Sequence, residues 1–420
     1  MRVLMIGGGI GGLTAALSLH AAGIEVDVYE AVPKLQPLGV GINLLPHAVR
    51  ELSELGLQED LAKIAIPTRE LVYANRYGQE IWREDRGLAA GYKWPQFSIH
   101  RGQLQMLLLD VARQRLGADR VHTDHMLTDF EQTADKVRAH FTTQDGRDQG
   151  SVQGDVMIAA DGIHSRVRAK FYPDEGAPKW NGCVLWRGKT EGPPYLSGRS
   201  MVMAGHQDQK FVCYPISAEA ETQGRSMINW IAEIRFKDLA LWRKESWNRQ
   251  GDLNDFLPAF ESWKFEWLDV PKLIRDGTSV YEYPMVDRDP LDRWTFGRVT
   301  LLGDSAHPMY PIGSNGASQA IIDARVLAYH MATAPDLDSA LKAYEEERRP
   351  ATNKIVLANR GNGPEQVMQL AEERAPTGFS HVHDVLSREE LEQIANNYKI
   401  TAGFESNRLN TQPSRTPPRR

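Results

Sequence analysis

Residues 5–16 read MIGGGIGGLTAA, and this stretch decides the fold of the first part of the chain. A short apolar strand at residues 2–6 leads into it, and a helix of small residues at 13–22 follows it. A second strand over 25–30 then ends in an acid. The stretch itself carries the pattern GxGxxG at Gly7, Gly9 and Gly12. Together these features predict a βαβ unit that binds a dinucleotide.

The residues of this motif have separate tasks. Gly7 permits the tight turn after the strand, Gly9 lets a pyrophosphate approach the backbone, and Gly12 lets the helix pack on the strand. The helix N-terminus adds free N–H groups and a partial positive charge. Glu30 stands where a carboxylate can accept hydrogen bonds from ribose hydroxyls. We predict that the nucleotide is held by Gly9, Gly11, Gly12 and Glu30.

The composition narrows the class of protein. With 420 residues and 41% hydrophobic content, the chain can form two lobes with a sizeable core. Its net charge of −6 and the lack of a basic stripe argue against a nucleic acid partner. The two cysteines form no metal-binding pattern, so we expect no metal and a cytoplasmic location. We expect no membrane partner, because no run of about 18 apolar residues occurs and the first strand leaves no room for a signal peptide.

A second stretch, residues 154–171, reads GDVMIAADGIHSRVRAKF. Its apolar run over 156–160 predicts a buried strand. Asp161 and Gly162 follow at the carboxyl end of that strand, where open α/β sheets place their ligands. Ser165 is a suitable cap for a helix that begins there. We therefore predict that Asp161 belongs to the cofactor site.

A third stretch, residues 297–324, reads GRVTLLGDSAHPMYPIGSNGASQAIIDA. A buried strand over 299–302 precedes Asp304, and a loop rich in glycine and proline leads into a helix from about Gly316. No second GxGxxG is present, so the far half of a long cofactor needs a different kind of site. FAD fits, with its ribityl chain on Asp304 and the N1–C2=O edge of the flavin at the amides of Asn315, Gly316 and Ala317. A helix N-terminus at that edge would stabilise the anionic reduced flavin.

These stretches resemble those of the class A flavoprotein aromatic monooxygenases, the para-hydroxybenzoate hydroxylase type. The family pattern DGxxSxVR is matched by Asp161, Gly162, Ser165, Val167 and Arg168. The pattern GDAAHxxxP is matched, with Ser305 in place of the first alanine, by Gly303, Asp304, Ala306, His307 and Pro311. The resemblance adds Arg101, at the start of a helix, and Pro311 to the cofactor contacts. The chain departs from the family pattern at Ser314 and Ser318, and its flexible loop residue is Gly313.

The resemblance also implies a chemistry. Members use NADH or NADPH and O2 to hydroxylate an aromatic ring through a flavin C4a-hydroperoxide. The stretches PLGVGINLLPHAV (37–49) and YPMVDRDPL (283–291) resemble those of phenazine-acid hydroxylases, so we expect an aromatic or N-heteroaromatic, phenazine-like acid as substrate. A hydroxypyridine or a phenolic acid is the alternative. The protein must then hold the ring in line and keep water out. In the first of these stretches, Gly41 is predicted to contact the flavin.

The predicted fold class is α/β (α+β overall): a Rossmann-like FAD-binding domain with an inserted antiparallel-sheet substrate domain and C-terminal helices. The discontinuous FAD-binding domain is predicted over 1–72, 98–180 and 284–335. The substrate domain is predicted over 73–97 and 181–283. The rest of the chain is predicted as helices over 336–400, interrupted by Pro350, and a polar tail over 401–420 that we expect to be disordered.

The second lobe should supply the substrate pocket. Eight of the ten tryptophans lie within 180–294, and KFVCYPIS and SMINWIAEI predict strands of an antiparallel sheet over the flavin. By the resemblance, Tyr214 on the first of these strands and Asn43 beside the flavin ring are the candidate catalytic residues. The alternatives are a half-buried sheet residue and a turn former. For His307 we favour a structural hydrogen bond over a catalytic base, and for Arg187 a substrate contact and a bracing role both stay open.

Three other functions are compatible with a glycine-rich nucleotide loop. A flavin-dependent halogenase shares the fold but needs a WxWxIP segment, which WKFEW does not match. A flavin-free NAD-dependent dehydrogenase would leave the stretch around Asp304 unexplained. A non-enzymatic flavin-binding or nicotinamide-sensing protein would show no substrate-stimulated NAD(P)H oxidation. The oligomeric state and the choice between NADH and NADPH stay open.

Overall fold

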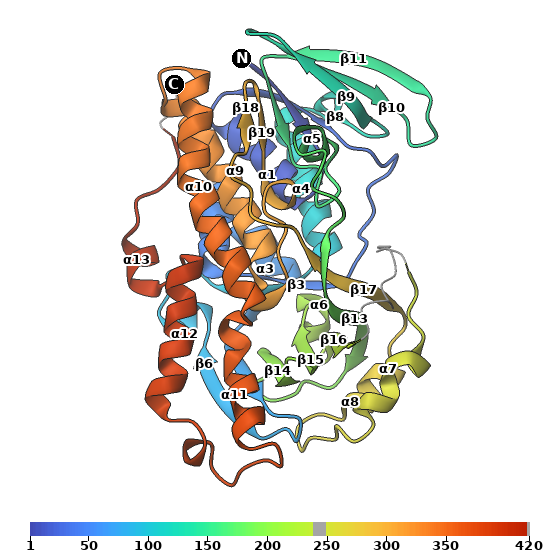
Figure 1. Ribbon diagram of the computed structural model, residues 1–420, viewed down its shortest axis with the longest axis vertical. Helices are drawn as coiled ribbons and strands as arrows, with labels where there is room; N and C mark the ends of the chain where they lie inside the picture. The colour runs from blue at the N-terminus through green and yellow to red at the C-terminus, as the bar shows by residue number, and fades with distance from the viewer. Residues whose placement is uncertain (238–248, 418–420) are drawn as a thin grey trace.

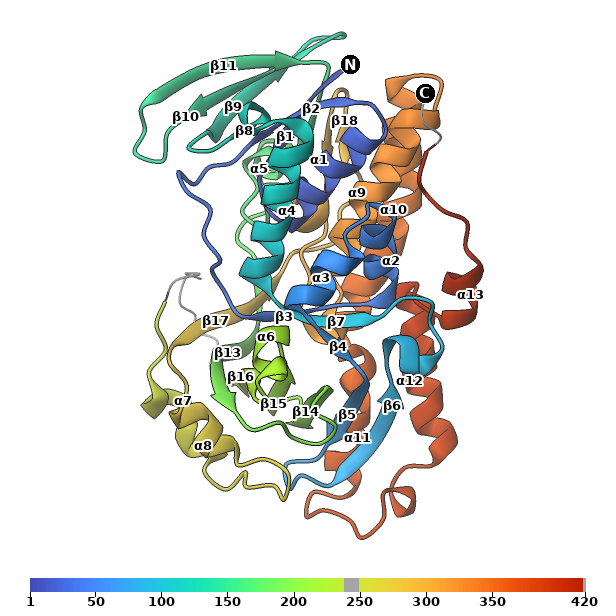
Figure 2. The same ribbon diagram turned by 180° about the vertical axis from the view of Figure 1, so that it is seen from behind.

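The computed structural model describes residues 1–237 and 249–417. Figure 1 shows a nucleotide lobe in the upper half, a lobe built on a large sheet below it, and a column of carboxyl-terminal helices along one side. Figure 2 shows from behind that strand β3 and its neighbours run between the two lobes. Within the described part of the chain, no helix is long and apolar enough to cross a membrane.

A six-stranded sheet forms the centre of the nucleotide lobe. Its order is β18 (Thr295–Phe296), β19 (Val299–Leu301), β12 (Val156–Ala159), β1 (Arg2–Ile6), β2 (Glu25–Tyr29) and β8 (Val121–His122). All neighbours are parallel except β18 and β19. The strands expected over 2–6, 25–30, 156–160 and 299–302 are therefore confirmed, and they are adjacent in space. Because parallel strands bring their carboxyl ends to one edge, the three quoted loops meet there.

Helices cover this sheet as its apolar strands require. Helix α1 (Ile10–Ala21) packs against α9 (Gly316–Thr333) on one side and α4 (Arg101–Leu116) on the other. A three-stranded antiparallel sheet, drawn at the top of Figure 1, comprises β9 (Met126–Gln132), β10 (Val137–Thr142) and β11 (Asp148–Gly154). The short helix α5 (Arg166–Phe171) is capped by the Ser165 hydroxyl, as expected.

A seven-stranded sheet forms the second lobe. Its order is β17 (Val280–Asp287), β13 (Lys179–Gly192), β16 (Ser226–Arg235), β15 (Gln209–Pro215), β14 (Ser200–His206), β5 (Glu70–Ala74) and β6 (Glu80–Asp85). The two strands expected from KFVCYPIS and SMINWIAEI are present as β15 and β16 and pair antiparallel. The domain boundaries given above stay a prediction.

The two faces of this sheet have different neighbours, as the two-residue period of a strand requires. Phe211 and Cys213 lie in an aromatic core with residues of α7 (Leu253–Phe260) and α8 (Val270–Arg275). Val212 and Tyr214, one residue along, lie in a cluster with residues of the loop before α9 and of α11 (Gln366–Arg374). The second face is therefore the one toward the predicted flavin loop.

A small sheet joins the lobes, in the order β3 (Gly41–Leu44), β7 (Gln96–His100) and β4 (Ile66–Thr68). Helices α2 (Pro46–Glu54), α3 (Gln58–Ile64) and α6 (Ala218–Thr222) lie beside it in Figure 2. The interruption expected at Pro350 is wrong, because α10 runs unbroken over Leu337–Arg360. Arg348, before the proline, and Ile355, after it, are both buried, so tertiary packing lets the helix continue past Pro350.

The expectation of a disordered tail from residue 401 is also wrong for the described residues. Helix α12 (Arg388–Ala402) is followed by α13 (Ser406–Thr411), and Phe404 and Leu409 are each 2% exposed. The buried Arg50 guanidinium donates to the carbonyls of Gln412, at 3.2 Å, and Pro413, at 2.5 Å. The polar composition of the tail gave no sign that Phe404 and Leu409 would be buried. The Arg50 guanidinium is also buried, and the carbonyls of the tail satisfy its donors.

Candidate FAD and substrate site

Close backbone packing explains two glycines of the first loop. Gly7 has φ of +107°, and a Cβ there would lie 2.3 Å from the carbonyl oxygen of Ala160. A Cβ on Gly12 would lie 2.0 Å from the carbonyl oxygen of Gly7. Both contacts are to backbone atoms, which cannot give way. The turn and helix-packing tasks expected of Gly7 and Gly12 are thus confirmed.

Gly9 differs, because a Cβ on it would meet nothing within 4 Å. The same is true of Gly316, the first residue of α9. The two helices cross closely, since a Cβ on Gly11 would lie 3.3 Å from that of Ala320. Gly316 is one turn, or about 6 Å, before Ala320. Two helix N-termini with open space in front of them therefore lie side by side, which fits an extended anionic ligand.

The open space in front of Gly9 and Gly316 is called the groove below. Glu30 directly follows β2 and lies beside the glycine loop that borders this groove. Its Oε2 accepts a hydrogen bond from the N–H of Gly8 at 2.6 Å, and its Oε1 accepts one from Val32 at 3.0 Å. These bonds hold the carboxylate rigidly beside the glycine loop. Each oxygen keeps a second lone pair that a ribose hydroxyl can use.

Asp161 connects the second loop to the third. Its Oδ1 accepts a hydrogen bond from the Ser305 hydroxyl at 3.0 Å, and its Oδ2 accepts one from the N–H of Arg166 at 2.9 Å. The Ser305 hydroxyl oxygen also accepts from the N–H of Gly162 at 3.1 Å. Burial raises the pKa of Asp161 despite these bonds. Ser305, which departs from the family pattern, thus ties the two loops together.

Asp304 and Arg101 lie close enough for the charge of each to affect the pKa of the other. Both side chains are exposed, yet enough protein surrounds them that burial raises the pKa of Asp304 and lowers that of Arg101. Exposure to solvent combined with close surrounding protein is what an open groove produces. Pro311, also predicted here, is exposed in the third loop, just before the turn over Ile312–Ser314.

The ring end of the predicted site is the N-terminus of α9. The N–H groups of Gly316 and Ala317 have no acceptor among residues 1–237 and 249–417, and no side chain caps this helix. Behind them the buried Asn315 side chain donates to the carbonyl of Gly313 at 3.1 Å and accepts from Gln319 at 3.1 Å. The N–H groups of Gly316 and Ala317, which are predicted to meet the flavin, are therefore available as donors, and the hydrogen bonds of Asn315 hold the backbone before them in place.

His307 has a structural bond, as favoured from the sequence. It is 1% exposed, and its Nε2 lies 2.5 Å from Oδ2 of Asp323 in α9. Arg348 donates to the other oxygen of Asp323 at 2.6 Å. Burial alone would raise the pKa of Asp323, but His307 and Arg348 outweigh it and hold that pKa below its usual value. His307 thus anchors the third loop to α9.

The peptide of Gly41 is held by three strands of the large sheet. Its carbonyl accepts from the Tyr214 hydroxyl at 2.9 Å and from Arg187 at 2.8 Å, and its N–H donates to Oδ1 of Asn229 at 2.7 Å. A Cβ on Gly41 would lie 2.7 Å from both Tyr214 and Asn229. Burial raises the pKa of Tyr214 to about 12, so its hydroxyl stays protonated. Tyr214 and Arg187 thus grip a predicted flavin contact.

Asn229 is a site residue that sequence reasoning missed. It is fully buried, and its Nδ2 has no acceptor in the described part of the chain. The buried Nε of Arg187 also lacks one there. In the sequence, Asn229 stands between the apolar residues Ile228 and Trp230 of β16, and this interruption is the signal that could have marked it. Asn43, predicted beside the flavin, is 3% exposed and accepts from the Ser98 hydroxyl at 2.6 Å.

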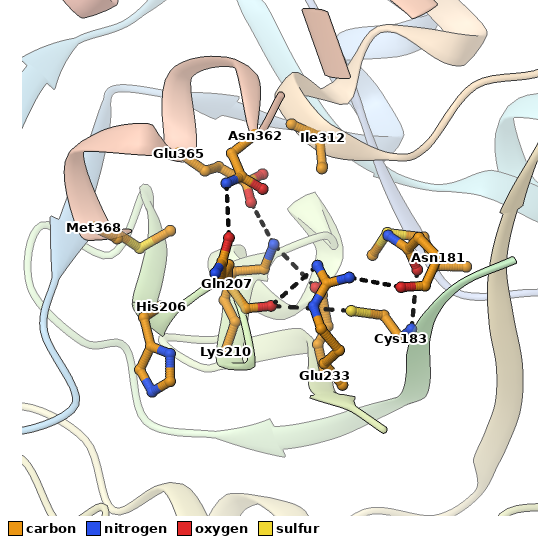
Figure 3. Close-up of a pocket in the computed structure, with 12 residues that line it drawn as sticks. Asn181, Cys183, His206, Gln207, Lys210, Glu233, Ile312, Asn362, Glu365 and Met368 are labelled. Atoms are coloured by element: carbon orange, nitrogen blue, oxygen red, sulfur yellow. Dashed lines mark hydrogen bonds and ion pairs between the residues drawn. The ribbon is translucent and has the colours of Figure 1, made fainter. Parts of the chain in front are cut away.

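A small polar pocket lies on the same face of the sheet, at the other end of these strands (Figure 3). Lys210 of β15 contacts Glu233 of β16, with 2.9 Å between Nζ and Oε2, and Glu365 in the turn before α11. Burial raises the pKa of Glu233, and the nearby Glu365 adds to this effect. Ile312 of the third loop lines the pocket. This buried cluster, also missed from the sequence, fixes the carboxyl-terminal helices to the sheet.

Comparisons with known proteins define the class. Residues 1–179 and 278–359 match the FAD binding domain family. The chain is 49% identical over 361 residues to the phenazine 1,6-dicarboxylic acid hydroxylase PhzS of Lysobacter antibioticus, covering 85% of this chain and 89% of that one. It is 30% identical over 377 residues to an FAD-dependent urate hydroxylase of Klebsiella pneumoniae, covering 86% and 89%.

Solved structures agree with the fold. The crystal structure of Klebsiella pneumoniae HpxO complexed with FAD and uric acid matches with a TM-score of 0.76 and 27% identity, over 96% of this chain and 97% of that one. The chain belongs to the FAD binding domain family, and it is a flavoprotein monooxygenase of the class A type. This membership confirms FAD and sets aside the flavin-free dehydrogenase. The groove fits the cofactor, because a side chain at Gly9 or Gly316 would project into it.

Proposed function

We propose that this monooxygenase uses NADH or NADPH and O2 to hydroxylate an N-heteroaromatic acid of the phenazine type. The observation that carries the proposal is the meeting of the two lobes at Gly41, a predicted flavin contact whose peptide is hydrogen-bonded by three residues of the large sheet. The likeness to the phenazine 1,6-dicarboxylic acid hydroxylase supports the substrate class. We place the enzyme in the cytoplasm, where nicotinamide cofactors are available.

Named residues would hold each part of the cofactor. The adenosine and pyrophosphate would lie on Gly9, Gly11, Gly12 and Glu30, at the N-terminus of α1. Arg101, Asp161, Asp304 and Pro311 would line the middle of the groove. The flavin ring would meet Gly41 on one side and Asn315, Gly316 and Ala317 on the other. When bound, FAD would take up electrons from the nicotinamide and pass them to O2, which is the source of the inserted oxygen atom.

The protein's own residues do the rest. Tyr214 and Asn43 stay the proposed catalytic residues. Tyr214 would act through the Gly41 carbonyl, to which its hydroxyl donates a hydrogen bond. The unpartnered donors Nε of Arg187 and Nδ2 of Asn229 would bind the carboxylate of the substrate, since buried donors need acceptors. The apolar residues on this sheet face would exclude water, which otherwise diverts the reaction to hydrogen peroxide.

A screen of aromatic acids tests this function. The holoenzyme is mixed with NADH or NADPH and one compound from a panel: phenazine-1-carboxylate, 5-methylphenazine-1-carboxylate, phenazine-1,6-dicarboxylate, a dihydroxypyridine or 3-hydroxybenzoate. Nicotinamide consumption and hydrogen peroxide are followed together. We expect phenazine acids to stimulate consumption with little peroxide. Stimulation by the pyridine or the benzoate alone would move the substrate class to the alternative.

Two controls accompany the screen. A bromide- or chloride-dependent product would indicate the halogenase alternative. Asp304→Ala should release FAD about tenfold more readily while leaving the melting temperature of the apoprotein unchanged, because it removes a ligand and no core volume. Unchanged FAD retention in this variant would remove Asp304 from the site.

A further inference from the structure

Tyr398 lies in α12, beyond residue 359 where the family match ends. It is 6% exposed and packs in a cluster of the carboxyl-terminal segment with Tyr92, Phe404 and Leu409. Burial raises the pKa of Tyr398 above its usual value, so the hydroxyl keeps its proton. Nothing in its sequence surroundings, NNYKITA, indicates a role in the site.

The hydroxyl of Tyr398 is nevertheless directed at the third loop. It accepts a hydrogen bond from Nδ2 of Asn315 at 2.9 Å. It can donate either to Oδ1 of Asn359, at 2.9 Å, or to the carbonyl of Ile312, at 3.2 Å. One side chain therefore contacts the last part of the loop at two points, and Asn359 ties the same group to α10. The two amide hydrogens of Asn315 are both used, on Tyr398 and on Gly313.

Gly313 shows how closely the tyrosine and the loop fit. It has φ of +67°, and a Cβ there would lie 2.0 Å from the hydroxyl oxygen of Tyr398. The turn is left-handed at this residue and at Ser314, which has φ of +58°. Gly313, the flexible residue of this loop, is thus the residue that lets α12 approach it.

Helix α12 has a second contact near Asn315, through Gln319 of α9. Gln319, one turn into α9, donates to Oδ1 of Asn315 at 3.1 Å and lies 3.2 Å from the carbonyl of Ala402. Its other end accepts from Arg348 at 2.6 Å. Asn315 is therefore held on both of its side-chain atoms by groups that α12 orders.

We propose that Tyr398 is a positioning residue for the flavin, acting through Asn315 on the free N–H groups of Gly316 and Ala317. The inference rests on the proposed place of the flavin ring at these amides. Donors at the N1–C2=O edge stabilise the reduced, anionic flavin more than the oxidised one. Fixing them raises the reduction potential of the bound cofactor, so the carboxyl-terminal helices set a property of the active site.

Tyr398→Phe tests the proposal, with Tyr92→Phe as the matched control. Tyr92 lies in the same cluster and donates its hydroxyl to the carbonyl of Phe404 at 2.6 Å, away from the loop. Both variants lose one buried hydroxyl and keep the ring. For each we would measure the melting temperature, the dissociation constants of FAD and ADP, and the midpoint potential of the bound flavin.

We expect similar melting temperatures for the two variants and unchanged ADP binding in both. Only Tyr398→Phe should weaken the reduced flavin relative to the oxidised one, by about tenfold, which is about 30 mV for a two-electron couple. A midpoint potential equal to that of the wild type, or an equal shift in Tyr92→Phe, would overturn the proposal. Asn315→Ala approaches the same contact from the other side and should give the same shift even where Tyr398→Phe folds poorly.

These measurements do not depend on the substrate. Failure of every aromatic acid to stimulate nicotinamide oxidation would end the proposed function and leave the flavin potentials as they are. A normal response to phenazine acids with an unshifted potential in both Tyr398→Phe and Asn315→Ala would end only the present inference.

Discussion

The two ends of the FAD groove are built in different ways. The nucleotide end uses Gly7, Gly9, Gly12 and Glu30, which lie within one βαβ unit; Gly12 packs on the Gly7 carbonyl, and Glu30 accepts a hydrogen bond from the neighbouring Gly8. The ring end uses Asn315 and Gly41, whose partners come from the large sheet and from α12. The first end depends on local backbone geometry. The second depends on hydrogen bonds between segments up to 188 residues apart.

This difference teaches how the enzyme can keep one cofactor and change its substrates. The residues that bind the nucleotide form together with their own strand and helix, and they do not depend on the structure of the second lobe. A ring end assembled from three elements changes whenever one of them changes. Four predictions about the two ends follow, beginning with the largest change in stability; the effect of acid is counted for one pH unit.

Gly12→Ala should be the most damaging of these substitutions, because its Cβ would overlap the Gly7 carbonyl oxygen at 2.0 Å. We expect a loss of stability of about 3 kcal/mol or more, together with loss of FAD. Gly9→Ala is the matched control, since its Cβ meets nothing within 4 Å. It should melt like the wild type and still bind FAD more weakly. Equal melting temperatures for the two variants would contradict the packing argument.

Gly313→Ala should damage the ring end alone. The alanine would be strained at φ of +67° and would overlap Tyr398, so we expect destabilisation of about 2 kcal/mol. FAD binding should weaken while ADP binding stays unchanged. Replacing Tyr398 by leucine as well should recover part of the loss, which a double-mutant cycle measures. A parallel loss of ADP affinity would show that the two ends are not independent.

The buried His47 should make the ring end sensitive to acid. It lies 3.2 Å from Gln319, and burial together with Arg348 lowers its pKa to about 3. Below about pH 6.5 this histidine binds a proton in the unfolded chain, whereas in the folded protein it stays neutral down to about pH 3. The free energy of unfolding should therefore fall by about 1.4 kcal/mol per pH unit from this group as the pH drops through this window. Its stabilising contribution is complete above pH 6.5.

Chemical unfolding at several pH values measures this slope. His47→Asn should reduce the proton uptake on unfolding by about one in this window. His20→Asn, which replaces an exposed histidine, is the control and should leave the slope unchanged. An equal slope in wild type and His47→Asn would contradict the prediction.

Tyr214→Phe should have the smallest effect. It removes one hydrogen bond to the Gly41 carbonyl, which keeps its bond from Arg187, so the loss of stability should be about 1 kcal/mol. FAD should stay bound, while hydrogen peroxide release per nicotinamide consumed should rise. Coupling identical to that of the wild type would return Tyr214 to an ordinary place in the sheet.

Much of this protein could be predicted from its sequence because the signals are local. The strands β1, β2, β12 and β19, the Ser165 cap and the start of α9 follow from residues close together in the chain. The loops after parallel strands must meet at one sheet edge, so the cofactor class followed as well. Class resemblance extended this reasoning to Arg101 and Pro311, which stay predicted contacts of the cofactor.

Only the tertiary structure decided what stands around the flavin ring. Asn229 and Tyr398 have no motif, and each acquires its role by meeting a partner more than 80 residues away. The same holds for Lys210, which joins the carboxyl-terminal helices to the other end of the sheet. The ordered tail and the unbroken α10 belong to the same group, because burial of Phe404, Leu409 and Ile355 overrides composition and the proline. Turns, caps and short strands depend on neighbouring residues and can be predicted from the sequence. Hydrogen bonds between buried polar groups of distant segments form only when the fold brings those segments together.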